Sequence, residues 1–202
     1  MKRITIILGL LALLLPMAAW ADGIDLTNQG GTITFTDAGV VSAGSELMSF
    51  NGIQAPRGHS LGSVSFSTGA FTGASLWTGG TFSSVGSSFI IKGVGNFGQP
   101  KGVIFDGAFF GPISWTVISH SGASYVFDLS GKISGMLWTG REVSGTTSQT
   151  IYAYTDQWPT DHKGGIHLGQ SQLTVPEPGT LGLLGTGLMA IAGTVRRKLM
   201  KS

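Results

Sequence analysis

The chain has 202 residues, of which only 11% are charged, whereas glycine alone contributes 33. It contains no cysteine, which excludes disulfides, thiolate metal ligands and a cysteine nucleophile. Half of the basic residues gather at the two ends. Between residues 22 and 175, nine acidic residues face six basic ones, a net charge of −3. This charge excludes a basic surface for binding nucleic acid.

The first 21 residues have the layout of a secretory signal peptide. Lys2 and Arg3 supply a positive start, and residues 4–15 form an apolar run that is too short to span a bilayer comfortably. Ala19 and Ala21 are small residues at the third and the last position before the expected cut. We therefore expect cleavage after Ala21 by signal peptidase, and export. An uncleaved membrane anchor is the alternative.

Residues 22–175 have the hydrophobic pattern of β-strands. Gly, Asn, Pro and Asp separate the apolar runs roughly every 8–12 residues, a spacing typical of antiparallel sheets. We predict one all-β domain, an antiparallel β-sandwich of jelly-roll or lectin-like type, between an N-terminal signal helix and a C-terminal transmembrane helix. The runs that carry this prediction are 32–36, 64–67, 89–91, 103–105, 113–117, 125–128, 151–154 and 166–175.

One short pattern occurs twice in this domain. Leu76-Trp77-Thr78-Gly79 returns as Leu137-Trp138-Thr139-Gly140, each time after a similar Gly-containing lead-in. We interpret the two copies as related strand–turn–strand units. Trp77 and Trp138 would then be either a paired ligand site or two core residues in similar hairpins. Because tryptophan is mostly buried, the second interpretation is favoured.

Two motifs resemble catalytic or cofactor-binding signatures by their letters alone. Residues 58–62 read Gly-His-Ser-Leu-Gly, the pattern of a nucleophile elbow around Ser60, but the elbow needs a strand before it and a helix after it. Residues 93–98 match the dinucleotide pattern Gly-x-Gly-x-x-Gly, which also needs a helix next. Neither flank supplies one, and the high glycine content makes chance matches common. We therefore predict no catalytic residue and no cofactor.

A polar segment follows the run that ends at residue 154. Asp156, Asp161, His162 and His167 could in principle ligate a divalent metal, but their spacing fits no established motif, and we expect no metal. Trp158 stands among polar and turn-forming residues of this segment. It is the aromatic side chain that we would choose as a contact for a glycan.

The last residues form a three-part tail, residues 176–202. Pro176-Glu177-Pro178 comes first, then residues 179–195 without a charge, then Arg196-Arg197-Lys198. About 17 residues at about 1.5 Å each reach roughly 25 Å, the short end of a membrane span, and the basic cluster should stay in the cytoplasm. This tail resembles the PEP-CTERM sorting domain of Gram-negative bacteria.

The resemblance implies cleavage near Pro-Glu-Pro by the membrane-embedded protease exosortase, in hosts that usually make exopolysaccharide. A plain membrane anchor has the same topology and is the alternative. The protein would be held in the membrane by the tail until processing, and would then reach the cell surface or the extracellular matrix.

Three classes of function remain for the domain. We expect a structural or adhesive envelope protein linked to exopolysaccharide, with signal peptidase and exosortase as processing partners and no nucleic acid. The alternative is a glycan-binding module, which would expose at least two aromatic rings on one concave face. A secreted hydrolase is less expected, and would bring titratable groups together in a pocket.

Overall fold

The computed structural model describes residues 23–154 and 162–175. These residues form eleven β-strands and contain no helix, so none of their segments is a helix long and apolar enough to cross a membrane. The strands are β1 (Gly23–Thr36), β2 (Gly39–Phe50), β3 (Ile53–Gln54), β4 (Gly62–Ser67), β5 (Phe71–Ser75), β6 (Gly79–Phe82), β7 (Ser88–Val94), β8 (Lys101–Ser121), β9 (Ser124–Leu137), β10 (Glu142–Tyr154) and β11 (His162–Thr174). The predicted all-β class is confirmed; the signal helix and the tail helix lie outside the described residues.

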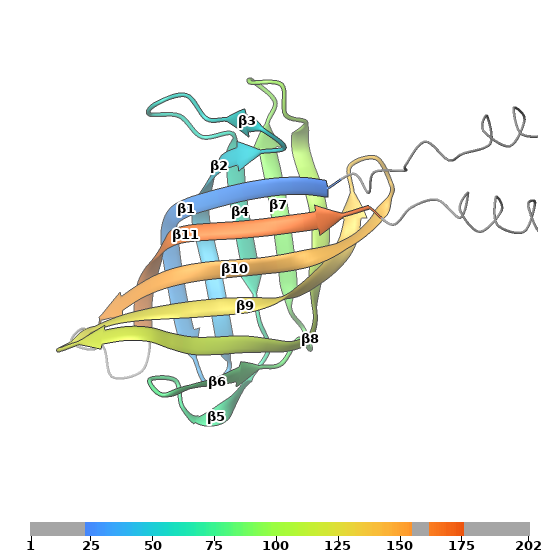
Figure 1. The fold of residues 1–202 in the computed structure, drawn as a ribbon. Helices are drawn as coiled ribbons and strands as arrows, with labels where there is room; N and C mark the ends of the chain where they lie inside the picture. Colours follow the sequence, from blue (N-terminus) through green and yellow to red (C-terminus); the bar gives the residue numbers. More distant parts are fainter. Residues whose placement is uncertain (1–22, 155–161, 176–202) are drawn as a thin grey trace, which may run out of the picture. The chain divides into compact units, whose positions relative to one another are not determined.

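The predicted sandwich is wrong, because the sheet closes on itself as an antiparallel barrel (Figure 1). The closed path runs β8-β7-β4-β2-β1-β11-β10-β9 and returns to β8. Closure depends on β8, which pairs with β7 along one edge and with β9 along the other. A sandwich would leave sheet edges unpaired at this point, whereas closure satisfies their backbone groups.

Strand β8 joins two predicted runs, 103–105 and 113–117, into a single strand of 21 residues. Pro112 lies between them and has no N–H to donate to a neighbour. The strand tolerates it because pairing with β7 ends at Gly107 and pairing with β6 begins only at Ile113. Toward β9, the register shifts between Phe110 and Ser114, so this side also has a break at the proline. The interruption in the sequence pattern is thus a local irregularity inside one strand.

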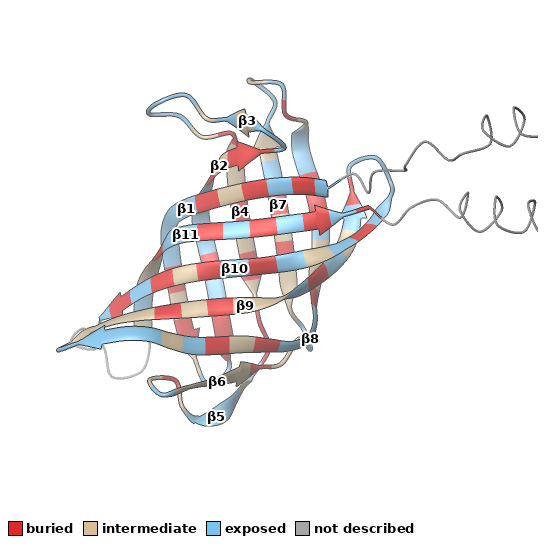
Figure 2. Cartoon of the chain, viewed as in Figure 1, coloured by how far each residue is buried: buried red, intermediate tan, exposed pale blue. Residues whose placement is uncertain are grey.

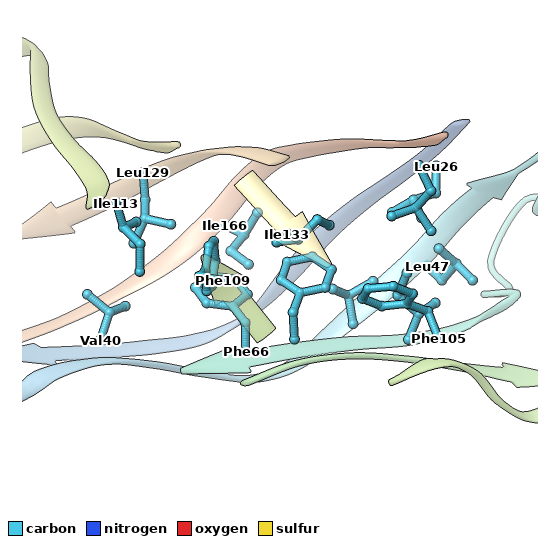
Figure 3. Packing of buried hydrophobic residues seen from close by; sticks show 14 of the residues in the cluster. Leu26, Val40, Leu47, Phe66, Phe105, Phe109, Ile113, Leu129, Ile133 and Ile166 are labelled. Carbon is cyan, nitrogen blue, oxygen red and sulfur yellow. The ribbon is translucent and has the colours of Figure 1, made fainter. Parts of the chain in front are cut away.

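The barrel interior is filled by apolar side chains that alternate with outward-facing residues along each strand (Figure 2). Figure 3 shows side chains from different walls, among them Leu26, Phe109 and Ile133, meeting in the space between the strands. The Trp115 and Phe127 rings stack with centroids 4.3 Å apart. Trp115 also donates its indole N–H to the Leu76 carbonyl at 2.7 Å, which fixes the β5–β6 turn to the core.

Strand β2 has no counterpart among the predicted runs. Two of its buried positions carry Ser42 and Ser45, so the polar and apolar residues do not alternate cleanly. A register shift between these two serines, where β2 pairs with β4, disturbs the pattern further. The short strands β5 and β6 form the hairpin whose turn contains Trp77, and they extend the sheet beside the second half of β8.

Candidate functional site

A groove with a volume of about 850 Å³ lies on the barrel surface and crosses five neighbouring strands. These are β1, β11, β10, β9 and β8, which form the wall of the barrel nearest the viewer in Figure 1. Ten of the 15 lining residues are polar or charged, and Leu26, Phe110 and Pro112 are the large apolar members. The lining residues are Asp25, Leu26, Thr27, Phe110, Gly111, Pro112, Ser130, Gly131, Lys132, Thr146, Thr147, Ser148, Gln170, Ser171 and Gln172.

Strand register arranges the outward-facing side chains of the groove in two transverse rows. Successive backbone pairings place five residues in the first row, which are Asp25, Gln172, Thr146, Lys132 and Phe110. The second row contains Thr27, Gln170, Ser148 and Ser130. Neighbouring strands lie about 4.8 Å apart, so the first row reaches about 19 Å across the strands.

The side chains of the two rows offer hydrogen-bonding groups and together carry little net charge. Gln170 and Gln172 are exposed, and a side-chain amide both donates and accepts hydrogen bonds. Asp25 and Lys132 supply one charge of each sign and are also exposed. Phe110 is 44% exposed and offers a ring at the end of the first row. The groove can therefore bind a hydroxyl-rich or amide-rich ligand that also has an apolar surface.

The floor of the groove is held by hydrogen bonds on the inner face of the same strands. Thr147 and Ser171 point into the barrel, are 3% and 4% exposed, and place their hydroxyl oxygens 2.7 Å apart. Thr147 also donates to the Gln170 carbonyl at 3.3 Å. On the outer face, Ser148 donates to a carboxylate oxygen of Asp128. These contacts fix neighbouring strands at the groove, so its side chains stand on a rigid surface.

The C-terminal segment identifies how the chain is handled by the cell. Residues 174–198 match the family model described as the PEP-CTERM protein-sorting motif. The chain carries a PEP-CTERM sorting motif. This motif implies that the chain is exported and is sorted by exosortase at its C-terminal tail. No curated protein and no solved structure matches the chain.

Several predicted site residues lie outside the described residues. They are the signal-peptide positions Ala19 and Ala21, the sorting residues Pro176, Glu177 and Pro178, the basic cluster Arg196, Arg197 and Lys198, the candidate glycan contact Trp158, and the carboxylates Asp156 and Asp161. Their roles remain predictions.

The repeated Leu-Trp-Thr-Gly pattern occupies two hairpin turns, as predicted. One turn joins β5 to β6 and the other joins β9 to β10. Trp77 packs against Tyr125, at the start of β9, with ring centroids 4.7 Å apart, whereas Trp138 follows the end of β9. The 14 residues of β9 span about 45 Å at about 3.3 Å per residue, so the two tryptophans cannot form one ligand site. Trp77 is partly buried and packs against the core, whereas Trp138 is 47% exposed.

The two histidines considered as metal ligands are directed to different faces of the sheet. The His162 ring lies 5.4 Å from the ring of Phe35, which is fully buried inside the barrel. The His167 ring lies 5.0 Å from Tyr152, an outward-facing residue that is 38% exposed. Within residues 23–154 and 162–175, no group of three or more His, Cys, Asp or Glu side chains is placed to hold a metal.

The two letter-matched motifs both lie in or beside loops that lead into a β-strand. Ser60 belongs to the loop between β3 and β4, and the buried Leu61 leads directly into strand β4. Residues 95–100 form the loop between β7 and β8, so the glycine pattern at 93–98 is also followed by a strand. Neither motif has the helix that its chemistry needs.

The groove itself was not predicted from the sequence. Asp25, Lys132 and Gln172 belong to three strands far apart in the chain, and only the register of β1, β9, β10 and β11 places them in one row. A weak signal does exist in residues 170–174, where Gln170, Gln172 and Thr174 alternate with buried residues. It indicates a polar outer face without indicating what lies beside it.

Proposed function

We propose that this protein is a structural or adhesive component of the cell surface or extracellular matrix, associated there with exopolysaccharide. The proposal is carried by the presence of a sorting motif and a surface groove in the same chain. The sorting motif delivers the chain to the outside of the cell, and the barrel has a polar, rigid groove across five strands. A closed barrel without sheet edges along its wall suits an exposed location, because it resists unwanted strand addition.

A catalytic role receives little support from the groove. Its two charged side chains, Asp25 and Lys132, stand on β1 and β9 with β11 and β10 between them. Three strand spacings separate them by about 14 Å, which is too far for the two groups to act on one bond. The groove therefore favours binding over chemistry, and we propose that the protein is not an enzyme.

Cell fractionation tests this proposal directly. We expect the wild-type protein, detected by antibody, to co-sediment with the polysaccharide matrix and to be released when the matrix is degraded by glycosidases. A variant that lacks residues 176–202 is the matched control for sorting, and it should appear free in the periplasm or the medium. Wild-type protein that is exported but stays free of the matrix would contradict the proposal.

A glycan-binding module is the second candidate, and the groove is the observation that favours it. The groove exposes one aromatic ring, Phe110, where two were expected of such a module. This difference makes hydrogen bonding the main source of any affinity. The structural role and the binding role are compatible, since a matrix protein must adhere to its polymer.

A further inference from the structure

We infer that the groove binds a single chain of an uncharged polysaccharide that lies across the five strands. This inference rests on the proposed function and names the class of ligand. Its starting point is the extent of the site, whose lining residues lie on five neighbouring strands. A ligand of about 19 Å, the reach of the first row, must be an extended polymer segment.

The hydrogen-bonding groups match a polymer of hydroxyls. Each sugar hydroxyl is both a donor and an acceptor, and it is best met by groups that can do both. Gln170, Gln172, Thr146 and Ser130 are such groups, and they stand side by side on β11, β10 and β9. A peptide backbone would instead seek an unpaired strand edge, which the continuous pairing of these strands does not offer.

The apolar groups stand at one end of the groove. Phe110 is 44% exposed and Pro112 lies beside it on β8, where the register with β9 is shifted. The C–H face of a sugar ring can pack on an aromatic ring while its hydroxyls remain at the edge. The first row thus begins with the carboxylate of Asp25 and the amide of Gln172 and ends with the ring of Phe110. This order suits a polysaccharide whose sugar units are partly apolar.

Charge selects against an anionic polymer. Asp25 and Lys132 cancel within the groove, and Asp128 adds a negative charge beside it through its bond with Ser148. The whole segment from residue 22 to residue 175 carries nine acidic and six basic residues, a net charge of −3. A polyuronate or a nucleic acid would meet repulsion here, whereas a neutral glycan would not.

Affinity electrophoresis of the mature, exported protein tests the inference. Native gels would contain a neutral glucan, a neutral mannan, a neutral galactan or a polyuronate. We expect at least one neutral polymer to retard the wild-type protein, and the polyuronate to leave it unretarded. Retardation should persist when ionic strength rises from about 50 to about 300 mM, because ion pairs contribute little. The inference is overturned if no neutral polymer retards the protein, or if the polyuronate alone does.

Substitutions in the groove test whether the polymer binds there. Gln170→Ala with Gln172→Ala should weaken retention at least tenfold, and Phe110→Ala should weaken it severalfold. Gln54→Ala on β3 and Val103→Ala on β8 are matched controls: Gln54 is exposed, and Val103 is 45% exposed on the same strand as Phe110. Thermal melting of each variant would show whether it remains folded. Equal losses in the controls and the groove variants would assign binding elsewhere.

The electrophoresis test of the groove and the fractionation test of the proposed matrix role can fail independently. Wild-type protein that co-sediments with the matrix, but is not retarded by any neutral polymer, would overturn the groove assignment and leave the matrix role intact. Retardation that needs the groove, in a protein that never reaches the matrix, would support the groove and overturn the matrix role.

Discussion

The side-chain amides of Asn28 and Gln149 hydrogen-bond to each other in both directions inside the barrel. Asn28 donates to Gln149 Oε1 at 3.0 Å, and Gln149 donates to Asn28 Oδ1 at 3.3 Å. Both residues are fully buried, and both stand opposite Gly169 of β11, the strand between theirs. Because Gly169 has no side chain, the two amides can meet across it.

This amide pair is the centre of a fully satisfied network. Asn28 donates its second side-chain N–H to the Ser45 hydroxyl oxygen at 2.8 Å. Gln149 donates its second side-chain N–H to the Thr147 hydroxyl oxygen at 2.9 Å. Ser45 in turn donates a hydrogen bond from its hydroxyl to the Gln29 carbonyl at 3.2 Å. Such a network fixes which strands are neighbours, since any slip in register would leave several buried polar groups without partners.

We predict that Asn28→Ala destabilises the barrel by about 3 kcal/mol, because it leaves Gln149 Oε1 and one of the two Gln149 side-chain N–H groups buried without partners. The measurement is chemical denaturation of the mature protein. Gln29→Ala is the matched control: Gln29 is the exposed neighbour on the same strand, and its loss should cost less than about 0.5 kcal/mol. Similar values for the two variants would show that the network contributes nothing to stability.

Gly169→Ala should also destabilise the protein, by about 2 kcal/mol or more, while Gly165→Ala on the same strand should be nearly neutral. A methyl group on Gly169 would overlap the side-chain oxygens of both Asn28 and Gln149. A methyl group on Gly165 would meet only the Gly31 carbonyl, 3.4 Å away. Thermal unfolding of the two variants distinguishes them, and a stable Gly169→Ala protein would mean that the network can rearrange.

Trp115→Ala should cost about 3–5 kcal/mol, because the residue is 1% exposed and its removal also leaves the Leu76 carbonyl without its donor. Trp138→Ala should cost less than about 1 kcal/mol, since 47% of that side chain is already in water. Denaturant titration of both variants provides the comparison. If Trp138→Ala were as damaging as Trp115→Ala, the exposed position of Trp138 would be incorrect.

Ser60 should not react as a nucleophile. It lies in the loop that leads from β3 into β4, without the tight strand-to-helix turn that exposes and activates a catalytic serine. A fluorophosphonate probe should leave the protein unlabelled, and simple ester substrates should not be hydrolysed. Stoichiometric labelling that disappears in Ser60→Ala would instead make the protein a hydrolase.

Replacing Pro176, Glu177 and Pro178 together by Ala should block processing of the tail. In a host that has exosortase, intact-mass analysis should find the wild-type protein shortened near these residues, and the variant longer and held in the membrane fraction. The reason is that these three residues are the Pro-Glu-Pro part of the matched sorting motif, near which exosortase is expected to cut. A wild-type protein that keeps its whole tail would favour the plain membrane anchor.

Local pattern was sufficient to predict most of the strands and the sorting signal. Alternation predicted strands at residues such as 125–128 and 151–154 because the two faces of a strand differ in burial. The sorting signal was readable because its parts are contiguous, so the order of Pro-Glu-Pro, apolar run and basic cluster needs no fold to be recognised. The pattern missed β2, since Ser45 stands in the barrel interior as part of a network that no local rule describes.

Closure and the groove were decided only by tertiary structure. Strands in which polar and apolar residues alternate are equally compatible with a sandwich and a barrel. The choice depends on whether β8 pairs with both β7 and β9. The groove depends on register: Asp25 and Lys132 are over one hundred residues apart in the chain and reach the same row through Gln172 and Thr146. A sequence determines which side of its own strand each residue occupies. Which residue stands beside it on the next strand is set by long-range pairing, whose free energy comes from the whole core.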